Sequence, residues 1–300
     1  MATTVVSPRP FIHWVGGKKQ LLPIILDKLN TLPPITRYIE PFIGGGAVFF
    51  AVEAKRYIIN DMNEELINAY QCVKNYPQEL ILQLKELEDD YYRLHTDTEQ
   101  ETFYLQVRNL DRSPTFKQDL TEIMRAVRFI FITKIGYNGL YRVNRAGLNN
   151  TPFGHNIRHN KKPTICDAPT IIACSQKLAR TDIYLGSYEA LIPSAKKTDV
   201  WFFDPPYIPL VEEKVETGTQ KDYVGYTKEG FSIKDQWKLV EHLHTLDRKG
   251  VKFLLTNHNA PLAQELYRGF NIQPIMAKRS ISSDASGRGA TLSEILVSNF

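Results

Sequence analysis

Several features that would mark a secreted, metal-binding or membrane protein are missing from this sequence. Its 300 residues include only three cysteines, Cys72, Cys166 and Cys174, and none belongs to a CxxC pair. An odd number at these spacings predicts neither a disulfide framework nor a zinc site, and it favours a reducing cytosol. The seven histidines form no HExxH-type cluster, so we expect no metal site. No apolar run approaches about 18 residues and no signal-peptide pattern opens the chain, so we expect neither a membrane span nor export.

A strong excess of one charge is missing too. The formal net charge is +4, and charged residues make up 23% of the chain against 43% hydrophobic residues. This composition argues against a disordered chain and supplies enough apolar residues for a large core. The slight basic excess permits a polyanionic partner such as nucleic acid, but an ordinary protein with a few extra lysines fits it equally well.

The chain has no internal repeat, but its pattern of apolar and charged residues changes at two points. Residues 1–63 show a strand, a glycine turn, the start of a helix and a second strand ending in an acid, which is typical of a nucleotide-binding α/β unit. Residues 64–166 have helical spacing and many charges, and residues 167–300 return to the α/β pattern. The expected strands lie at 37–41, 56–60, 182–185, 199–203, 251–256, around Ser280 and at 295–298. The expected helices lie at 80–87, 102–110, 116–135, 233–246 and 260–267.

The most informative motif is Asp204-Pro205-Pro206-Tyr207. It directly follows the apolar run 200–203, which has the composition of a central strand covered on both faces. Ligands of open parallel sheets bind beyond the carboxyl ends of the strands, so this motif would place a rigid polar and aromatic corner in the site. A proline-rich loop with an unrelated aromatic residue is the alternative.

The residue types of this corner suit chemistry on an aromatic amino group. The amino nitrogen of adenine is a poor nucleophile because its lone pair is delocalised into the ring. The Asp204 carboxylate and the Pro205 carbonyl can accept its two hydrogens, which favours the geometry that frees the lone pair for in-line attack on a sulfonium methyl. Tyr207 would stack on the base, a contact worth about 1–3 kcal/mol. The candidate catalytic residues are Asp204, Pro205, Pro206 and Tyr207.

Three further segments are weaker when taken alone. Glycines 44–46 follow the first expected strand and fit either a nucleotide or a plain turn; a phosphate loop is disfavoured because no Gly-Lys-Ser/Thr follows. Asp61 ends the second strand, where an acid commonly binds ribose hydroxyls, although it could equally cap the helix that follows. Two glycines between Trp14 and Lys18 suggest close approach to a ligand carboxylate.

Together these motifs make the sequence similar to the Dam-type, or D12-class, DNA adenine methyltransferases. The similarity covers nearly the whole chain and keeps that family's order: FIHWVGGK at 11–18, EPFIGGG at 40–46, IINDMN at 58–63 and DPPY at 204–207. It implies a Rossmann-like, S-adenosylmethionine-dependent α/β methyltransferase fold with a mostly parallel sheet. It also implies the arrangement in which a helical target-recognition domain, here 64–166, is inserted into a catalytic and cofactor-binding domain formed by 1–63 and 167–300.

The resemblance implies S-adenosyl-L-methionine as the cofactor and assigns residues to it. Trp14 and Lys18 would contact it, Phe42 and the glycines would form its pocket, and Asp61 would bind its ribose. Ser187 and Tyr188 stand where many members have an Asp-Phe pair near the cofactor adenine. The full expected set is Trp14, Lys18, Glu40, Phe42, Gly44, Gly46, Asp61, Ser187, Tyr188 and Asp204.

The resemblance extends to a segment that enters duplex DNA in similar enzymes reading GATC. Arg142 carries a fork suited to guanine in the major groove, and Tyr137 can wedge into the space left by a flipped base. A structural hairpin with solvated charges is the alternative, and nearby basic residues are either phosphate contacts or merely solvated. The expected DNA-binding residues are Tyr137, Asn138, Leu140, Arg142, Asn144, Pro152, Arg279, Ser280 and Arg288. The basic residues nearby are Arg145, Arg158, Lys161, Lys162 and Lys278.

The expected function is therefore methyl transfer to the amino group of a flipped adenine in double-stranded DNA, within GATC. We expect a monomer of the bacterial or phage cytoplasm, acting on nucleoid DNA, with any cognate restriction endonuclease acting without a stable complex. Two alternatives stay open: an adenine methyltransferase acting on RNA, and a catalytically inactive DNA-binding regulator. Transfer to a protein amide is disfavoured because similar amide-modifying enzymes begin this motif with Asn.

Overall fold

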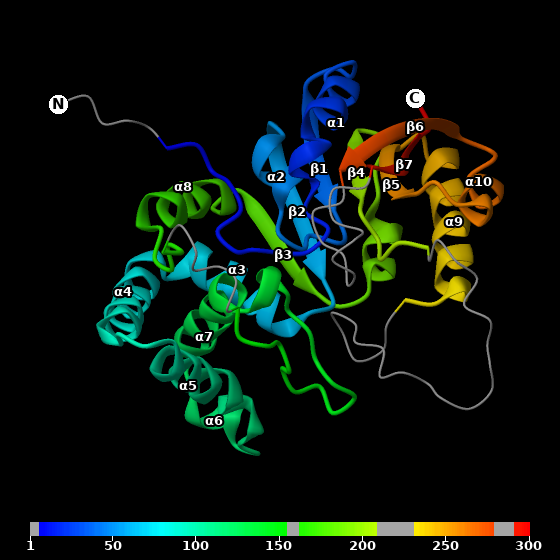
Figure 1. The fold of residues 1–300 in the computed structure, drawn as a ribbon. Helices are drawn as coiled ribbons and strands as arrows, with labels where there is room; N and C mark the ends of the chain where they lie inside the picture. Colours follow the sequence, from blue (N-terminus) through cyan, green and yellow to red (C-terminus); the bar gives the residue numbers. More distant parts are fainter. Residues whose placement is uncertain (1–5, 155–161, 209–230, 279–290) are drawn as a thin grey trace, which may run out of the picture.

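The structure is a computed structural model, and it describes residues 6–154, 162–208, 231–278 and 291–300. Within these residues seven strands form one sheet in the order β3-β2-β1-β4-β5-β7-β6 (Figure 1). Strands β1 to β5 pair in parallel, and β7 runs antiparallel to both β5 and β6. The bounds are β1 Ile35–Glu40, β2 Ala54–Asp61, β3 Thr181–Leu185, β4 Asp199–Phe203, β5 Lys252–His258, β6 Asn271–Lys278 and β7 Thr291–Ser298.

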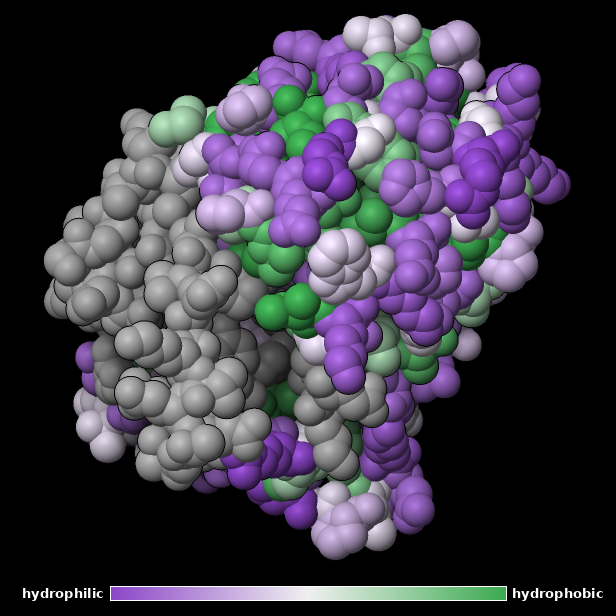
Figure 2. Space-filling model, turned by 90° about the vertical axis from the view of Figure 1, so that its right-hand side faces the viewer, coloured by the Kyte–Doolittle hydropathy of each residue, from purple (hydrophilic) through white to green (hydrophobic). Residues whose placement is uncertain are grey.

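Helices cover both faces of this sheet. Their bounds are α1 Leu22–Leu29, α2 Ala47–Ala51, α3 Glu64–Asn75, α4 Pro77–Arg93, α5 Asp97–Arg108, α6 Phe116–Asp119, α7 Glu122–Ile135, α8 Ala168–Leu178, α9 Ile233–Arg248 and α10 Pro261–Leu266. Short 3-10 turns lie at η1 Lys18–Gln20, η2 Asn109–Arg112, η3 Tyr137–Gly139 and η5 Tyr188–Ser194. The face over α9 and α10 carries mostly hydrophilic side chains among its described residues, with hydrophobic ones between them (Figure 2).

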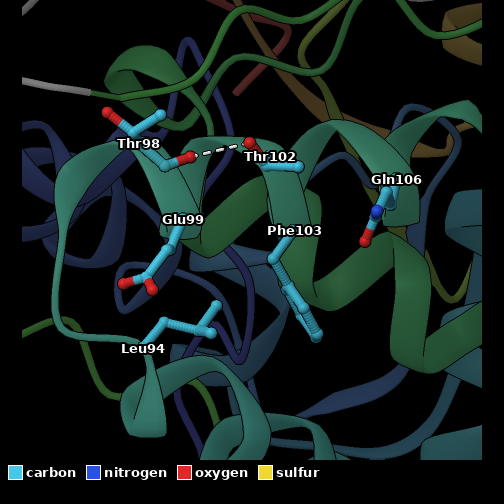
Figure 3. Close-up of a pocket in the computed structure, with 6 residues that line it drawn as sticks. All are labelled: Leu94, Thr98, Glu99, Thr102, Phe103 and Gln106. Carbon is cyan, nitrogen blue, oxygen red and sulfur yellow. Dashed lines mark hydrogen bonds between the residues drawn. The ribbon is translucent and has the colours of Figure 1, made fainter.

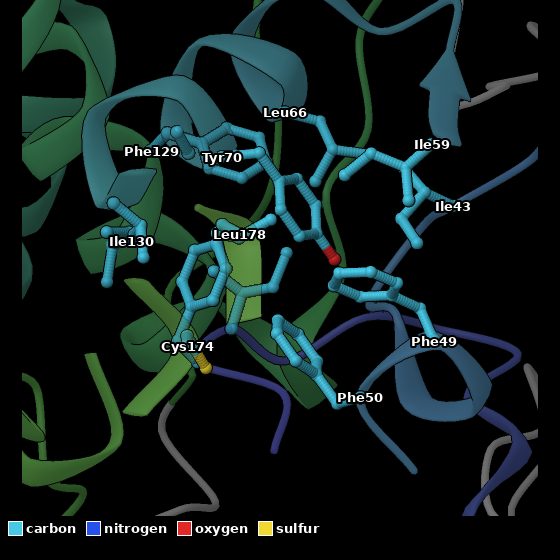
Figure 4. Packing of buried hydrophobic residues seen from close by; sticks show 14 of the residues in the cluster. Ile43, Phe49, Phe50, Ile59, Leu66, Tyr70, Phe129, Ile130, Cys174 and Leu178 are labelled. Carbon is cyan, nitrogen blue, oxygen red and sulfur yellow. The ribbon is translucent and has the colours of Figure 1, made fainter. Parts of the chain in front are cut away.

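Alternation along the buried strands creates two cores, one on each face of the sheet. In β4, Val200 and Phe202 join the cluster under α1, α2, α3 and α8, whereas Trp201 and Phe203 join the cluster under α9 and α10. Figure 4 shows part of the first cluster, where Tyr70 of α3 packs against Phe49 and Phe50 of α2. Every residue of β4 is buried, as the continuous apolar run predicted.

The helical segment leaves and re-enters the sheet between β2 and β3. Helices α3 and α8 pack against each other and against β3, and α4, α5, α6 and α7 lie beyond them (Figure 1). The first core cluster continues from the strands through α3 into α4 and α7 without a break. This cluster therefore contains residues of both expected parts of the chain, 1–63 with 167–300 and 64–166.

One sequence-based expectation about elements needs correction. The single helix expected over 116–135 is two helices, because the chain is extended at Leu120 and Thr121, and the Thr121 side chain accepts a hydrogen bond from the Met124 N–H to begin α7. The strand expected around Ser280 lies outside the described residues; the described strand β6 precedes it, at 271–278, and pairs with β7. Among the described residues, no helix is long and apolar enough to cross a membrane, and no group of His, Cys, Asp or Glu could hold a metal ion.

Candidate active site

The site lies at the carboxyl ends of β1 and β4, where the order of the sheet reverses. From β1 the chain moves outward to β2 and β3, and from β4 it moves the other way to β5. The crevice between two such strands is where open α/β sheets bind ligands. Here it is bounded by the glycine segment after β1 and by Asp204 after β4, so the topology brings together the two motifs that the sequence analysis singled out.

The glycine segment is held tightly because its neighbours leave no room for side chains. Gly44 and Gly46 have φ values of 45° and 69°. A Cβ on Gly44 would lie 2.9 Å from the indole of Trp14, and one on Gly46 would lie 2.5 Å from Tyr70 Oη. The Tyr70 hydroxyl donates to Gly44 O at 3.0 Å. Trp14 therefore lies directly against this loop, as a residue shaping the same pocket would.

Asp61 at the end of β2 is fixed by two backbone donors. The Gly44 N–H reaches one carboxylate oxygen at 3.1 Å, and the Asn63 N–H reaches the other at 3.0 Å. Burial raises the pKa of the Asp61 carboxyl, and these N–H groups oppose that rise. The helix-cap alternative does not hold, because Asn63 is the residue that caps α3, accepting from Leu66 N at 3.0 Å.

A residue that sequence reasoning missed joins the strand ends around this loop. Asn60 is buried, and its side-chain amide donates to Pro41 O at 3.0 Å and to Gly186 O at 2.9 Å. It therefore links the turns after β1 and β3 across β2. An amide within an apolar strand was the available signal, because a buried amide needs partners.

The Asp204 carboxylate is held through both of its oxygens. Lys18 Nζ lies 2.7 Å from Oδ2, and the Thr256 hydroxyl donates to Oδ1 at 2.8 Å. The Lys18 ammonium also donates to Gly16 O at 2.6 Å and lies over the ring of Tyr207, 4.8 Å from its centre. The Asp204 side chain keeps 21% of its surface exposed, against 7% for Lys18. The Asp204 carboxylate is therefore the more exposed member of this ion pair.

Tyr207 is positioned by β5 and β7. Its hydroxyl donates to Glu294 Oε2 at 2.7 Å, and its ring lies edge-on to His258 with centres 4.7 Å apart. Burial raises the pKa of Tyr207 well above its ordinary value, and the charges of Asp204 and Glu294 add to the rise. The phenol therefore stays protonated and keeps its hydrogen bond to Glu294.

The proline corner itself is bonded to α9 and β5. Gln236 Nε2 donates to Pro206 O at 2.7 Å, and Ile208 N donates to Asn257 Oδ1 at 3.0 Å. Pro205 is buried and Pro206 is exposed. The corner is thus held on both sides, and two of the residues around it, Gln236 and Glu294, carried no local sequence signal.

Glu40 lies behind this corner as a second carboxyl group. It is 2% exposed, and the Tyr38 hydroxyl donates to its Oε2 at 2.7 Å. Burial raises the pKa of Glu40 well above its ordinary range; the hydrogen bond from Tyr38 opposes the rise, and the charge of Asp204 adds to it. Glu40 is therefore a buried acid beside the crevice, at the end of β1.

Two of the remaining residues expected at the cofactor, Phe42 and Tyr188, pack their rings against each other. Phe42 lies 5.1 Å from the ring of Tyr188 and meets Phe231 edge-on at 5.8 Å. Tyr188 is 5% exposed, and its hydroxyl is paired with His242 Nδ1 at 3.1 Å. Ser187 accepts from Glu189 N at the start of η5. The buried ring of Tyr188 thus packs against Phe42, while the side chain of Ser187 caps the turn that begins η5.

The hairpin expected to read DNA projects from the end of α7. It is anchored at its base, where Tyr104 and Arg108 of α5 donate to Thr151 O at 3.1 and 3.0 Å, and Asn149 N donates to Asp111 Oδ2 at 2.7 Å. At its tip Asn144 Oδ1 accepts from the N–H groups of Ala146 and Leu148, both at 3.0 Å. The Asn144 side chain therefore closes the turn at the tip of the hairpin.

The other expected hairpin residues divide between its surface and its interior. Pro152 is exposed, and Tyr137, Asn138 and Leu140 are partly exposed, with Asn138 at a φ of 54°. Arg142 lies back along the hairpin, with Nη2 3.3 Å from Asn150 O. Its Nε is buried without a hydrogen-bond partner among the described residues. The guanidinium is thus placed at the hairpin but retains unused donor capacity.

A stacked aromatic group connects the hairpin to the glycine loop. Tyr141 is 4% exposed, and its ring lies nearly parallel to that of Trp14, with centres 6.0 Å apart. Phe129 of α7 packs against both rings. The sequence of the hairpin did not reveal this contact, because Trp14 and Tyr141 are 127 positions apart. The same tryptophan lies against Gly44.

Several expected contacts fall outside the described residues. These are Arg279, Ser280 and Arg288, together with Arg158 and Lys161.

A shallow depression elsewhere does not belong to the site: it lies between the end of α4 and α5 and is lined by Leu94, Thr98, Glu99, Thr102, Phe103 and Gln106 (Figure 3). The glycine loop and Asp204 contribute no residue to it.

The sheet order and the motifs at its switch point are those of the α/β methyltransferases. Comparison with known proteins narrows the class: residues 14–281 match the family model described as D12 class N6 adenine-specific DNA methyltransferase. The chain therefore belongs to this family and is an adenine-specific DNA methyltransferase.

Individual relatives align along almost their whole length. The chain is 38% identical to type II methyltransferase M1.LlaDCHI of Lactococcus lactis subsp. cremoris, covering 98% of this chain and 96% of the relative. It is 37% identical to type II methyltransferase M.MjaIII of Methanocaldococcus jannaschii, covering 97% and 99%. It is 30% identical to the DNA adenine methylase of Escherichia coli K12, covering 93% and 91%.

Proposed function

We propose that this protein transfers the methyl group of S-adenosyl-L-methionine to the amino group of an adenine flipped out of duplex DNA, within GATC. The observation that carries the proposal is the Asp204 carboxylate, hydrogen-bonded through both oxygens and placed beside the ring of Tyr207. A duplex hides the adenine amino group from such a corner, so the base must leave the stack to reach it.

The glycine loop and the strand ends around it fit the proposed cofactor. Gly44 and Gly46 bring bare backbone to the crevice, Asp61 offers a fixed carboxylate for ribose hydroxyls, and Trp14 lies along the loop. Phe42 adds an aromatic surface on the side of β3. When bound, S-adenosylmethionine supplies an electrophilic methyl group.

Asp204 and the Pro205 carbonyl would accept hydrogen bonds from the two N–H groups of the adenine amino group, leaving its lone pair free to attack the methyl carbon. The N–C bond would form as the S–C bond breaks, the sulfur would leave as a neutral thioether, and one amino proton would pass to solvent. Tyr207 would carry the base by stacking, because its ring is already held by Glu294 and His258. Lys18 now lies 2.7 Å from Asp204 and over the same ring. An amino group held there would compete with this ammonium, so Lys18 would yield to the base and turn to the carboxylate of the cofactor.

The proposal assigns target recognition to 64–166 and catalysis to 1–63 with 167–300. The hairpin supports it: Arg142 is partly exposed and carries the guanidinium suited to guanine, and Leu140 and Pro152 offer partly open apolar surface for a thymine methyl. We propose that the enzyme acts as a monomer on nucleoid DNA in the cytoplasm, and that a cognate endonuclease, where one exists, forms no stable complex with it.

The test is tritium transfer from labelled S-adenosylmethionine to four substrates: duplex DNA containing GATC, the same duplex with GATC scrambled, single-stranded RNA and bulk protein. We expect labelling of the GATC duplex alone. Asp204→Ala should abolish turnover while leaving DNA binding largely intact, because the carboxylate acts on the amino group at the transition state. Labelled RNA would favour the RNA alternative, and a folded wild-type protein without transfer would favour an inactive regulator. Substantial turnover by Asp204→Ala would remove the mechanism.

A further inference from the structure

Thr256 occupies a particular place in the site. It is fully buried at the end of β5, the strand next to β4. The parallel register pairs Phe203 with Leu255, so Asp204 and Thr256 are the next residues along the two strands. Their side chains meet, and Thr256 Oγ1 lies 2.8 Å from Asp204 Oδ1.

The direction of this hydrogen bond follows from the charge of its acceptor. An ionised carboxylate has no proton to give, so the single hydroxyl proton of Thr256 must point at Asp204. A buried hydroxyl without a partner is destabilising, whereas valine has nearly the same shape and needs no hydrogen-bond partner. Packing alone would therefore be served by valine at this position, and the hydroxyl is what the bond to Asp204 requires.

Lys18 cannot fix the carboxylate in the same way. Its ammonium lies where the substrate amino group has to be held, over the ring of Tyr207. Its Nζ is shared between Asp204 and Gly16 O. A contact that the base displaces cannot orient Asp204 during the reaction. Thr256 approaches the opposite oxygen from inside the sheet, where neither base nor cofactor would displace it.

We propose that Thr256 is a positioning residue for methyl transfer: its hydroxyl fixes the plane of the Asp204 carboxylate, so that the remaining lone pairs point at the amino hydrogens. The inference rests on the proposed role of Asp204. It requires the hydroxyl to matter for the chemical step and not for binding, because Thr256 is fully buried. Its hydroxyl also interacts with that of Tyr207, which Glu294 holds independently.

The experiment compares Thr256→Ser, which keeps the hydroxyl, with Thr256→Val, which keeps the shape, in single-turnover methylation of a GATC duplex. A misplacement of about 1 Å in a reacting group can cost on the order of 10²-fold, so we expect the Val variant to be about 10- to 100-fold slower. The Ser variant should stay within about threefold of wild type. The KM for DNA, the Kd for S-adenosylmethionine and the thermal midpoint should stay unchanged in both.

Each other outcome overturns the inference. A Val variant as fast as wild type shows that the hydroxyl is not needed, and a Ser variant as slow as Val shows that it is not sufficient. A loss expressed in KM or cofactor Kd shows a structural role. Thr256→Ala replaces Val if Val fails to fold. Failure of the proposed function itself looks different: the wild-type protein would not methylate adenine, or Asp204→Ala would remain active.

Discussion

Gly46→Ala, in the glycine loop after β1, should lower the stability of the protein more than the same change at another left-handed glycine. An added Cβ at Gly46 would lie 2.5 Å from Tyr70 Oη and 3.2 Å from the ring of Phe50. Both neighbours are buried, so neither moves without repacking. The Tyr70 hydroxyl holds Gly44 O, and pushing it away removes the bond that fixes the loop.

The expected magnitude has two parts. A left-handed backbone costs an L-residue about 1–2 kcal/mol, and an unmade buried hydrogen bond costs about 1–3 kcal/mol. Gly46→Ala should therefore lower the free energy of unfolding by about 2–5 kcal/mol. Gly147 is the matched control, because its φ is 80° and nothing lies within 4 Å of its added Cβ. Gly147→Ala should cost only the backbone part, about 1–2 kcal/mol.

The assay is urea unfolding of both variants, with calorimetric titration of S-adenosylmethionine. Gly46→Ala should weaken cofactor binding at least about tenfold, the equivalent of about 1.4 kcal/mol, while Gly147→Ala should leave it unchanged. Removing the clashing atom offers an internal check. The double variant Gly46→Ala with Tyr70→Phe should lose less stability than the sum of the losses of the two single variants. Equal losses at both glycines, or additive costs in the double variant, would refute the steric reasoning.

Three further predictions concern single side chains. Lys18→Ala and Asp61→Ala should weaken the binding of S-adenosylmethionine, measured by calorimetry, more than the binding of DNA. Unchanged cofactor affinity in both variants would show that the cofactor site is assigned to the wrong place. Arg142→Ala should relax selectivity at one guanine by about 1–3 kcal/mol, read from methylation of duplexes with each base substituted in turn; a uniform loss would indicate a phosphate contact. Burial lowers the pKa of Lys177 to about 8, so between pH 8 and its unfolded value the unfolded chain binds more protons and stability rises with pH. The stability of wild type relative to Lys177→Met should therefore grow over that window in pH-dependent unfolding, and parallel curves would contradict the assignment.

The parts of the site that the sequence predicted are those in which neighbours along the chain determine the geometry. The apolar run before Asp204 is the fully buried β4, and the glycines after β1 have left-handed conformations. The acid at 61 ends β2 as expected. Strand, turn and acid are local patterns, and the order of the motifs places them at one edge of the sheet because parallel strands share a carboxyl end.

The parts that escaped are contacts between distant segments. Glu294 reads as an ordinary strand residue, and only the pairing of β5 with β7 brings it to Tyr207. The side chain of Arg142 illustrates a different limit. Its residue type suits guanine, but its direction depends on the Asn150 carbonyl across the hairpin, which no local pattern specifies.

The continuous core has a consequence for how such enzymes acquire new targets. Helix α3 buries Leu66, Ile67, Tyr70 and Val73 within the cluster that also holds the strands, so a cut at residue 64 would run through packed side chains. A chimaera that exchanged 64–166 as a cassette would open this core unless the facing residues were exchanged with it. The hairpin is attached by polar bonds to α5 and η2 and by the buried rings of Tyr141 and Phe153. Changes at its exposed positions would leave this core intact, whereas transplantation of the whole of 64–166 would not.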